Sequence, residues 1–342
     1  MGDTDFALHL AGETGAFKSE LAALHQQHFG AEMTRLNLPG AWSSTANALE
    51  TASFCAKDVL FVVDDFAPGG SSTDVARYHG AADRVFRAAG NHAGRCRLDS
   101  TARLREPKPP RALILSTGED VPRGQSVRAR MLVLELLKNS VDIRHLTECQ
   151  KCARDGLYSE AMGGFVCWLA CELEDKRAWL AHKVTEYRHR ALSSSGHARI
   201  PDIVANLQAG FELFLKFSVE CGAIGQAERD RSAECCWEAL LNAAAEQGKH
   251  QAETEPASRF LALLRSLLAS GRAHLEARDG GEPDHLPGSC GWHPDNSGRR
   301  LPLGECLGWV GDDGVYLEPS AAFRAVQVAA TWAKYWQYPS TR

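Results

Sequence analysis

One short segment limits the folds open to this chain more than any other. It reads GETGAFKS over residues 12–19, and it follows the apolar run of residues 6–11. Good helix formers fill residues 18–28, directly after it. A glycine-containing turn between a strand and a helix directs backbone N–H groups and the positive end of the helix dipole at one point. The segment therefore predicts an anion-binding loop at the edge of a parallel sheet.

The same segment matches most of the phosphate-loop signature G-x-x-x-x-G-K-[ST]. Gly12, Lys18 and Ser19 are in place, whereas Phe17 replaces the second glycine and Gly15 lies two residues earlier. We expect Lys18 to reach the terminal phosphates of ATP and Ser19 to ligate Mg²⁺. A helix start with a chance glycine and lysine is the alternative interpretation. The residues expected to contact the nucleotide are Gly12, Thr14, Gly15, Ala16, Phe17, Lys18, Ser19 and Glu20.

Two carboxylates follow the apolar run of residues 59–63, namely Asp64 and Asp65. Phosphoryl transfer needs one carboxylate in the Mg²⁺ shell and one group that orients the attacking water. We assign Asp64 to the metal and Asp65 to the water, because the pair follows the loop by about one strand–helix–strand unit. An ordinary strand end with solvated acids is the alternative.

A second apolar run, residues 112–115, ends in Ser116 and Thr117. In motor ATPases a polar residue at this place lies between the metal-binding strand and the γ-phosphate. Ser116 or Thr117 could fill that role, and Thr117 is the candidate that we assign to the site. Arg130 precedes the next apolar run and is the candidate for an arginine that acts on a neighbouring subunit. Arg123 and Arg128 are weaker candidates, with solvated arginines as the alternative.

The order of elements predicts an α/β fold with a parallel sheet. Strands expected near residues 6–11, 37–42, 59–63, 111–116 and 131–136 alternate with helices. The pattern then turns almost wholly helical. A last part combines a helix over residues 256–279, two short apolar pieces and a closing helix, which is typical of a winged-helix-like module. The expected domains are a P-loop ATPase core (1–137), a helical region (138–255) and this C-terminal module (256–342).

Four segments carry a resemblance to known families. Residues 128–136 are similar to the Arg-then-strand motif of superfamily-three-type (AAA+-like) helicases and primase-helicases. The runs WSSTAN (42–47), VDDFAP (63–68) and LSTGEDVPRGQ (115–125) resemble the domain-of-unknown-function 927 ATPases of mobile elements. The resemblance implies ATP and Mg²⁺ as cofactors, a homo-oligomer, expected to be a hexamer, with Arg130 acting in trans, and a primase-like N-terminal partner.

A basic segment lies just before the polar-tip strand, where such motors place a DNA-gripping hairpin. Arg95, Arg97, Arg103 and Arg105 flank a turn expected at Asp99 and Ser100. A ring of such hairpins would contact the phosphates of single-stranded DNA. A solvated basic loop is the alternative.

Composition sets the remaining limits. The net charge of −5 does not indicate a nucleic-acid binder overall, so basic patches have to be located one by one. The 11 cysteines form no disulfide framework, and no apolar run reaches membrane-spanning length, which favours a cytoplasmic protein with reduced thiols.

Cysteine spacing does not favour a structural zinc site. Cys149 and Cys152 form one tight pair, but Cys167 and Cys171 are spaced as on one helix face, which indicates core packing. In the tail, Cys290, His293 and Cys306 are too loosely spaced to predict a site.

These features together predict an ATP-driven DNA helicase or translocase that acts in mobile-element replication. A non-translocating ATPase switch or loader is the first alternative. An inactive relative is the second, if Phe17 closes the loop.

Overall fold

The computed structural model describes residues 4–94, 96, 98, 100–104, 106–192, 199–254 and 256–336. The chain divides into two compact units, Met1–Lys249 and His250–Arg342. Each unit has its own hydrophobic core.

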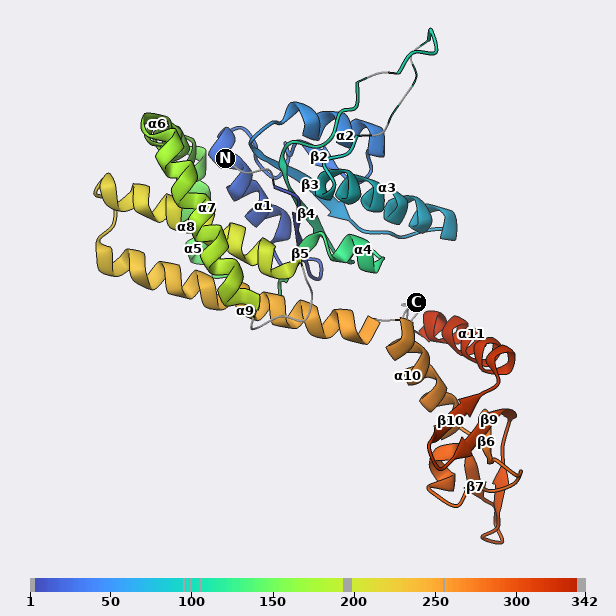
Figure 1. The fold of residues 1–342 in the computed structure, drawn as a ribbon. Coiled ribbons are helices and arrows are strands. Elements are labelled where there is room, and N and C mark those ends of the chain that lie inside the picture. Colours follow the sequence, from blue (N-terminus) through green and yellow to red (C-terminus); the bar gives the residue numbers. More distant parts are fainter. Residues whose placement is uncertain are drawn as a thin grey trace. The chain divides into compact units, whose positions relative to one another are not determined.

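The first unit is built on a five-stranded sheet in which every pair of neighbours is parallel (Figure 1). The strand order is β2-β3-β4-β1-β5. This confirms the predicted parallel α/β architecture. Because parallel strands end at the same edge, the segments that follow β1, β3 and β4 meet there. The strands are β1 (Ala7–Ala11), β2 (Gly40–Ala41), β3 (Leu60–Phe66), β4 (Leu113–Gly118) and β5 (Met131–Glu135).

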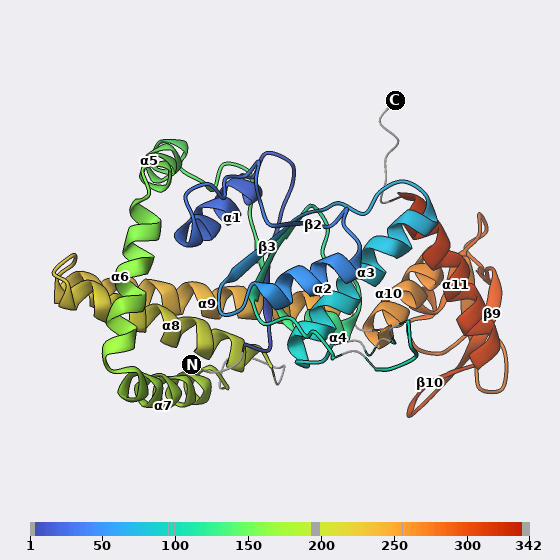
Figure 2. The same cartoon turned by 90° about the horizontal axis from the view of Figure 1, so that it is seen from above.

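Helices cover both faces of this sheet, since alternate side chains of each strand point to opposite faces. Phe61, Val63 and Ile114 pack under α2 (Ala46–Cys55) and α3 (Ser72–Gly90). Leu10, Val62 and Leu115 pack with α1 (Lys18–Gln26) on the other face. Figure 2 shows α1 on one side of β3, with α2 and α3 on the other. A short helix, α4 (Gln125–Arg128), leads into β5.

The helical region packs against this sheet and belongs to the same unit up to Lys249. A buried cluster joins Leu132 of β5 to Tyr187 of α7, Ile203 of α8 and Trp237 of α9. Its helices are α5 (Ile143–Arg154), α6 (Leu157–Cys171), α7 (Leu173–Leu192), α8 (Ile200–Glu220) and α9 (Gln226–Thr254).

One side chain of α9 hydrogen-bonds to the outer backbone groups of β5, which is an edge strand of the sheet. Gln247 is buried; its Oε1 accepts from the Val133 N–H at 2.9 Å, and its Nε2 donates to the carbonyls of Arg128 and Met131. An edge strand normally presents unpaired backbone groups to other chains. Gln247 therefore occupies backbone groups at the start of β5 with which another chain could otherwise pair.

Helix α6 departs from the sequence prediction of core packing. None of its residues is buried, and Cys167 and Cys171 are exposed although the helix is apolar. Spacing along a helix shows which residues share a face, but only the neighbouring elements decide whether that face is covered.

In its described residues, the second unit packs α10, α11 and short strands around a separate core. The predicted helix over residues 256–279 is wrong in its second half: α10 (Pro256–Ala269) ends before Gly271, which has φ 66°, and residues 273–277 form a strand. Glycine takes this left-handed conformation without steric cost, so it ends the helix. The other elements are β6 (Ala273–Ala277), β7 (Trp292–Pro294), β8 (Arg300–Pro302), β9 (Glu305–Gly311), β10 (Gly314–Leu317) and α11 (Pro319–Trp336).

The strands of this unit form two sheets rather than a single hairpin. One sheet has the order β10-β9-β6, with β9 antiparallel to β10 and parallel to β6, and the other pairs β7 with β8. Leu267 of α10, Leu275 of β6 and Leu307 of β9 lie in one core with Val326 of α11. In the described part of the chain, none of the helices has the length and hydrophobicity needed to cross a membrane.

Candidate functional site

The loop between β1 and α1 has the backbone shape that a phosphate-binding turn requires. A Cβ on Gly12 would lie 2.4 Å from the carbonyl oxygen of Leu136, so this position admits only glycine. Gly15 has φ 88°. Phe17 adopts φ 60° and ψ 22° at the N-cap of α1, the left-handed conformation that the glycine of the standard signature would supply.

The Phe17 side chain explains how a non-glycine residue holds that conformation. A left-handed L-residue costs about 1 kcal/mol or more. The half-buried ring packs in a cluster with Leu24, Leu146 of α5 and Tyr158 of α6. This packing offsets the backbone cost and links the loop to the helical region.

Lys18 lies over the loop. Its Nζ donates to the carbonyl oxygens of Gly12 and Glu13, both at 2.8 Å. Glu13 is paired in turn with Lys138 at 2.6 Å, and this hydrogen bond holds the pKa of its carboxyl below the usual range. Thr14 donates from Oγ1 to Glu119, beyond the end of β4. The loop is thus tied to the segments that follow β4 and β5.

Three of the predicted residues meet at one carboxylate oxygen. Ser19 donates from Oγ to Asp64 Oδ1 at 2.8 Å, and Thr117 donates from Oγ1 to the same oxygen at 2.5 Å. The Asp65 N–H donates to Thr117 Oγ1 at 3.2 Å. The group consists of hard oxygen donors, which is the donor chemistry that Mg²⁺ prefers. The residues present therefore fit the Mg²⁺ that the sequence predicts.

Asp65 occupies an unusual backbone position beside this group. It has φ 67°, and the β3–β4 register shifts between Val63 and Phe66. Its side chain is exposed, whereas Asp64 is half-buried. The irregularity turns the two carboxylates to different environments. Non-glycine residues in this conformation concentrate at functional sites.

Ser116 serves a different purpose from Thr117. The Trp42 Nε1–H donates to Ser116 Oγ at 2.9 Å, and His9 Nδ1 lies 2.9 Å from the same oxygen. His9 Nε2 lies 3.0 Å from the carbonyl oxygen of Asp120. Since a carbonyl only accepts, Nε2 carries the proton and Nδ1 accepts from the serine. Burial lowers the pKa of His9 from 6.5 to about 4, so the ring is neutral at physiological pH.

The sequence did not single out His9, Trp42 or Glu119 for this site. A histidine in the middle of an apolar strand was the available signal for His9. The histidine and the tryptophan tie β1 and the end of β2 to β4 beneath the site. They are structural supports of the polar strand tip.

Arg130 lies at the end of the sheet where the strands begin, whereas the loop lies at the end where the strands finish. Its carbonyl accepts from the Ala7 N–H at the start of β1, whereas the loop follows the end of β1. The guanidinium donates to Asn91 Oδ1 at 2.8 Å and to the carbonyl of Ser126 at 2.6 Å. The length of β1, about 17 Å at the usual rise per residue, separates Arg130 from its own loop.

Arg123, Arg128 and Glu20 have the following surroundings. Arg123 is exposed, and Arg128 donates to the carbonyl of Pro122 at 3.3 Å. The Glu20 carboxylate accepts from Gln150 at 2.8 Å and from Arg35 at 2.7 Å. The side chain of Glu20, predicted to contact the nucleotide, therefore connects α1 to α5 and to Arg35.

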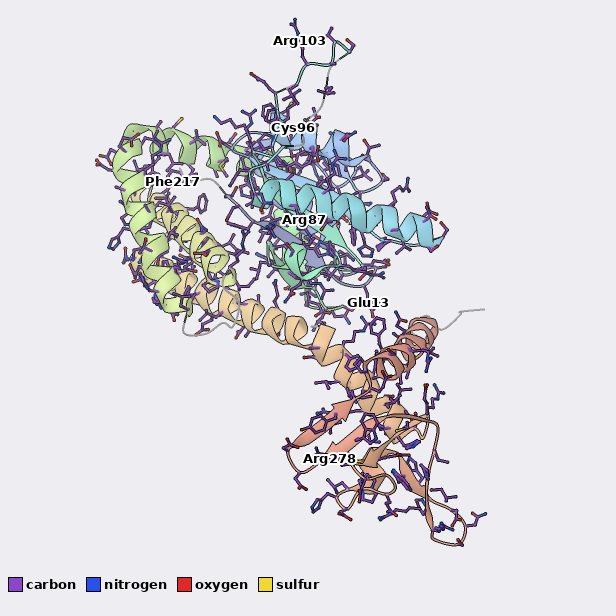
Figure 3. The ribbon with its side chains drawn as sticks, turned by 45° about the vertical axis from the view of Figure 1, so that its right-hand side comes forward. Glu13, Arg87, Cys96, Arg103, Phe217 and Arg278 are labelled. Atoms are coloured by element: carbon purple, nitrogen blue, oxygen red, sulfur yellow. The ribbon has the colours of Figure 1, made fainter. Side chains whose placement is uncertain are left out.

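The basic segment is described only in part. Arg95, Arg97, Arg105 and Asp99 lie outside the described residues. Leu98 and Leu104 form an antiparallel bridge, and Arg103 beside it is exposed. In Figure 3, Arg103 lies at the far end of a segment that extends from the body of the unit, on the side away from Glu13.

The comparisons with known proteins find one distant relative in fold. No family model matches the chain, and no curated protein matches it. A solved structure named "SCCmec type IV Cch - active helicase" is similar, with a TM-score of 0.63 at 13% identity. The match covers 94% of this chain and 54% of that one, so this chain spans about half the length of its structural relative. The chain therefore shares the fold of that structure over most of its own length.

The buried His9 predicts a pH dependence of stability. Its folded-state pKa, about 4, is below the unfolded value of 6.5. The contribution of neutral His9 to the free energy of unfolding is therefore complete above pH 6.5. It is lost as the pH falls toward 4, by up to about 1.4 kcal/mol per pH unit. Urea unfolding at pH 7 and pH 5 should show a smaller loss for His9→Gln than for the wild type. Exposed His145→Gln should behave like the wild type, and an equal loss in all three proteins would contradict the prediction.

Proposed function

We propose that this chain is an ATP-driven, DNA-translocating ATPase of the helicase type that acts in the replication of mobile elements. The observation that carries the proposal is the meeting of Ser19 and Thr117 hydroxyls at Asp64 Oδ1, next to a loop spanned by Lys18. A phosphate loop, an acidic strand end and a polar strand tip are the parts that nucleotide hydrolysis requires.

Each side chain has a distinct task in this proposal. Lys18 exchanges its bonds to the Gly12 and Glu13 carbonyls for phosphate oxygens, which places a positive charge where negative charge develops. Ser19 and Asp64 hold Mg²⁺, which when bound neutralises phosphate charge. Exposed Asp65 orients the attacking water, and Thr117 holds the backbone of Asp65 in register. The other predicted loop residues, Thr14, Ala16 and Glu20 among them, shape the nucleotide pocket.

The position of Arg130 favours a ring in which it acts on a neighbour. The length of the sheet keeps it from the loop of its own chain, but a surface at the opposite edge can face the loop of the next subunit. Head-to-tail contacts of this kind close into rings. We propose a hexamer in which Arg130 completes the adjacent site.

The basic hairpin and the C-terminal unit would contact the nucleic acid. Arg103 projects from the unit near a β-bridge, as expected for a hairpin that follows DNA phosphates. The C-terminal unit has the order helix, strands, helix, and we propose that it serves as a winged-helix-like module (256–342). The other two proposed parts are the ATPase core (1–137) and the helical region (138–255). A primase-like N-terminal partner would act together with this ATPase. The similar structure is named as a helicase of a mobile element.

The first test is ATP turnover of Lys18→Ala, measured with and without single-stranded DNA. Loss of the loop's positive charge should reduce turnover by at least about 100-fold, as loss of a preorganised charge-stabilising group does elsewhere. The control is Lys57→Ala, whose side chain is 58% exposed and pairs only with Asp58 among the contacts described. Unchanged turnover of Lys18→Ala would remove the site assignment.

The trans role of Arg130 is tested by mixing inactive subunits. Arg130→Ala and Lys18→Ala should each be inactive alone. The first lacks the arginine that acts on the neighbouring subunit, and the second lacks the lysine of the phosphate loop. An equal mixture should recover activity, since about a quarter of the interfaces in a randomly mixed ring would join an intact loop to an intact arginine. Lys18→Ala mixed with Asp64→Asn is the control, because both changes damage the same side of the interface. Failure of the first mixture to recover would exclude the trans role.

The DNA contact separates a translocase from an ATPase switch or loader, an alternative that the net charge of −5 keeps open. Arg103→Glu should weaken the stimulation of turnover by single-stranded DNA and leave basal turnover in place. Removing one phosphate contact should also reduce the slope of the logarithm of the binding constant against the logarithm of the salt concentration by about one. Arg231→Glu, on the exposed side of α9, is the control. If Arg103→Glu retains full stimulation, the switch or loader becomes the better reading.

A further inference from the structure

Three potential metal ligands meet in the C-terminal unit, far in sequence from the proposed ATP site. The donor atoms of His274, Glu276 and Cys306 all lie within 4.8 Å of one another. His274 and Glu276 are two residues apart on β6, so both point to one face of the sheet. Cys306 is the direct partner of His274 on the parallel neighbour β9. The sheet pairing therefore produces a cluster that sequence spacing could not show.

The hydrogen bond of His274 determines which ring nitrogen faces the cluster. Nδ1 lies 3.1 Å from the carbonyl oxygen of Leu303, so Nδ1 carries a proton. Nε2 is then the ring nitrogen on the side of Glu276, whose Oε1 is 3.6 Å away, too far for a hydrogen bond. A metal ion between the two atoms would be bound by both.

The surroundings hold the histidine and the cysteine in place. His274 is buried, with its ring edge-on to Trp292 at 6.1 Å. A Cβ on Gly304 would lie 2.0 Å from the carbonyl oxygen of Arg272, so the chain passes β6 closely just before Cys306. The Cys306 thiol donates to the Gly308 carbonyl at 3.5 Å. Loss of that proton would convert the thiol into the thiolate that binds metals.

We propose that His274, Glu276 and Cys306 bind a divalent transition-metal ion, Zn²⁺ by preference. Nitrogen, oxygen and sulfur donors together suit a borderline-soft ion and not Mg²⁺ or Ca²⁺. The Nδ1–H bond to the Leu303 carbonyl is the outer contact that metal-binding histidines usually make, and it orients Nε2 toward the ion. Three protein ligands leave a fourth position for water or an incoming ligand.

The ion would act on the fold of this unit. It would join β6 to β9, the one parallel pair in the β10-β9-β6 sheet, and so fasten the end of the strand that follows α10 to the hairpin that precedes α11. A small unit with a limited core gains most from such a cross-link. The proposal is independent of ATP hydrolysis.

The test uses the full-length reduced protein titrated with Co²⁺ in the presence of excess Mg²⁺. We expect one Co²⁺ per chain, with the visible absorption of a tetrahedral site and a thiolate charge-transfer band, and displacement of both by Zn²⁺. Cys306→Ser should lose the thiolate band. Glu276→Gln, at a half-exposed position, should keep the circular dichroism spectrum and bind at least about 100-fold more weakly, since even outer contacts of metal sites are worth 10–100-fold.

Two variants serve as matched controls. His285→Gln removes an exposed histidine of the same unit, and Cys149→Ser removes a thiol of the Cys149–Cys152 pair. Both should bind Co²⁺ like the wild type. A thiolate band that persists in Cys306→Ser or disappears in Cys149→Ser would overturn the proposal, as would a folded wild-type chain that binds no Co²⁺.

Discussion

The carboxylate of Asp64 is the point on which the arrangement of the first unit depends. It accepts hydroxyl hydrogens from Ser19 at the start of α1 and from Thr117 at the end of β4. In the sheet, β4 lies between β1 and β3, so its polar tip is next to both segments. Since all these strands are parallel, the loop, the acid and the polar tip meet at the edge where the strands end. A single oxygen thus joins three segments that are far apart in the sequence.

Packing beneath and beside that edge supports the site. His9 and Trp42 bind Ser116 from the face opposite Thr117, so adjacent residues of β4 have separate structural and polar roles. Phe17 holds a left-handed backbone and contributes its ring to a cluster with Leu146 of α5. A change at the loop can therefore reach the helical region by direct contact. On the edge strand β5, the Gln247 side chain hydrogen-bonds to the backbone of Met131 and Val133, just after Arg130.

Much of the first unit could be predicted because local rules decided it. The apolar runs before Asp64 and Ser116 became buried parallel strands, and the glycine-containing turn became the start of α1. The C-terminal unit was less predictable. The helix expected to continue to residue 279 ends at Ala269, because Gly271 breaks it and β6 gains partners from residues about 30 positions later. Helix α6 was expected to be covered, yet it carries an exposed apolar surface, since periodicity does not reveal what lies opposite.

The sequence by itself determined the chemistry available: a lysine and a serine after a glycine turn, paired carboxylates after a strand, and arginines before another. Only the tertiary structure decided which of these meet. Strand order brought Thr117 rather than Ser116 to Asp64, and strand direction put Arg130 at the far edge from its own loop. Parallel pairing of β6 with β9 likewise brought Cys306 beside His274, while Cys290 and His293 stayed apart from it. The reason is physical: spacing along a chain fixes direction and face within one element, whereas proximity between elements depends on pairing and packing across the whole unit.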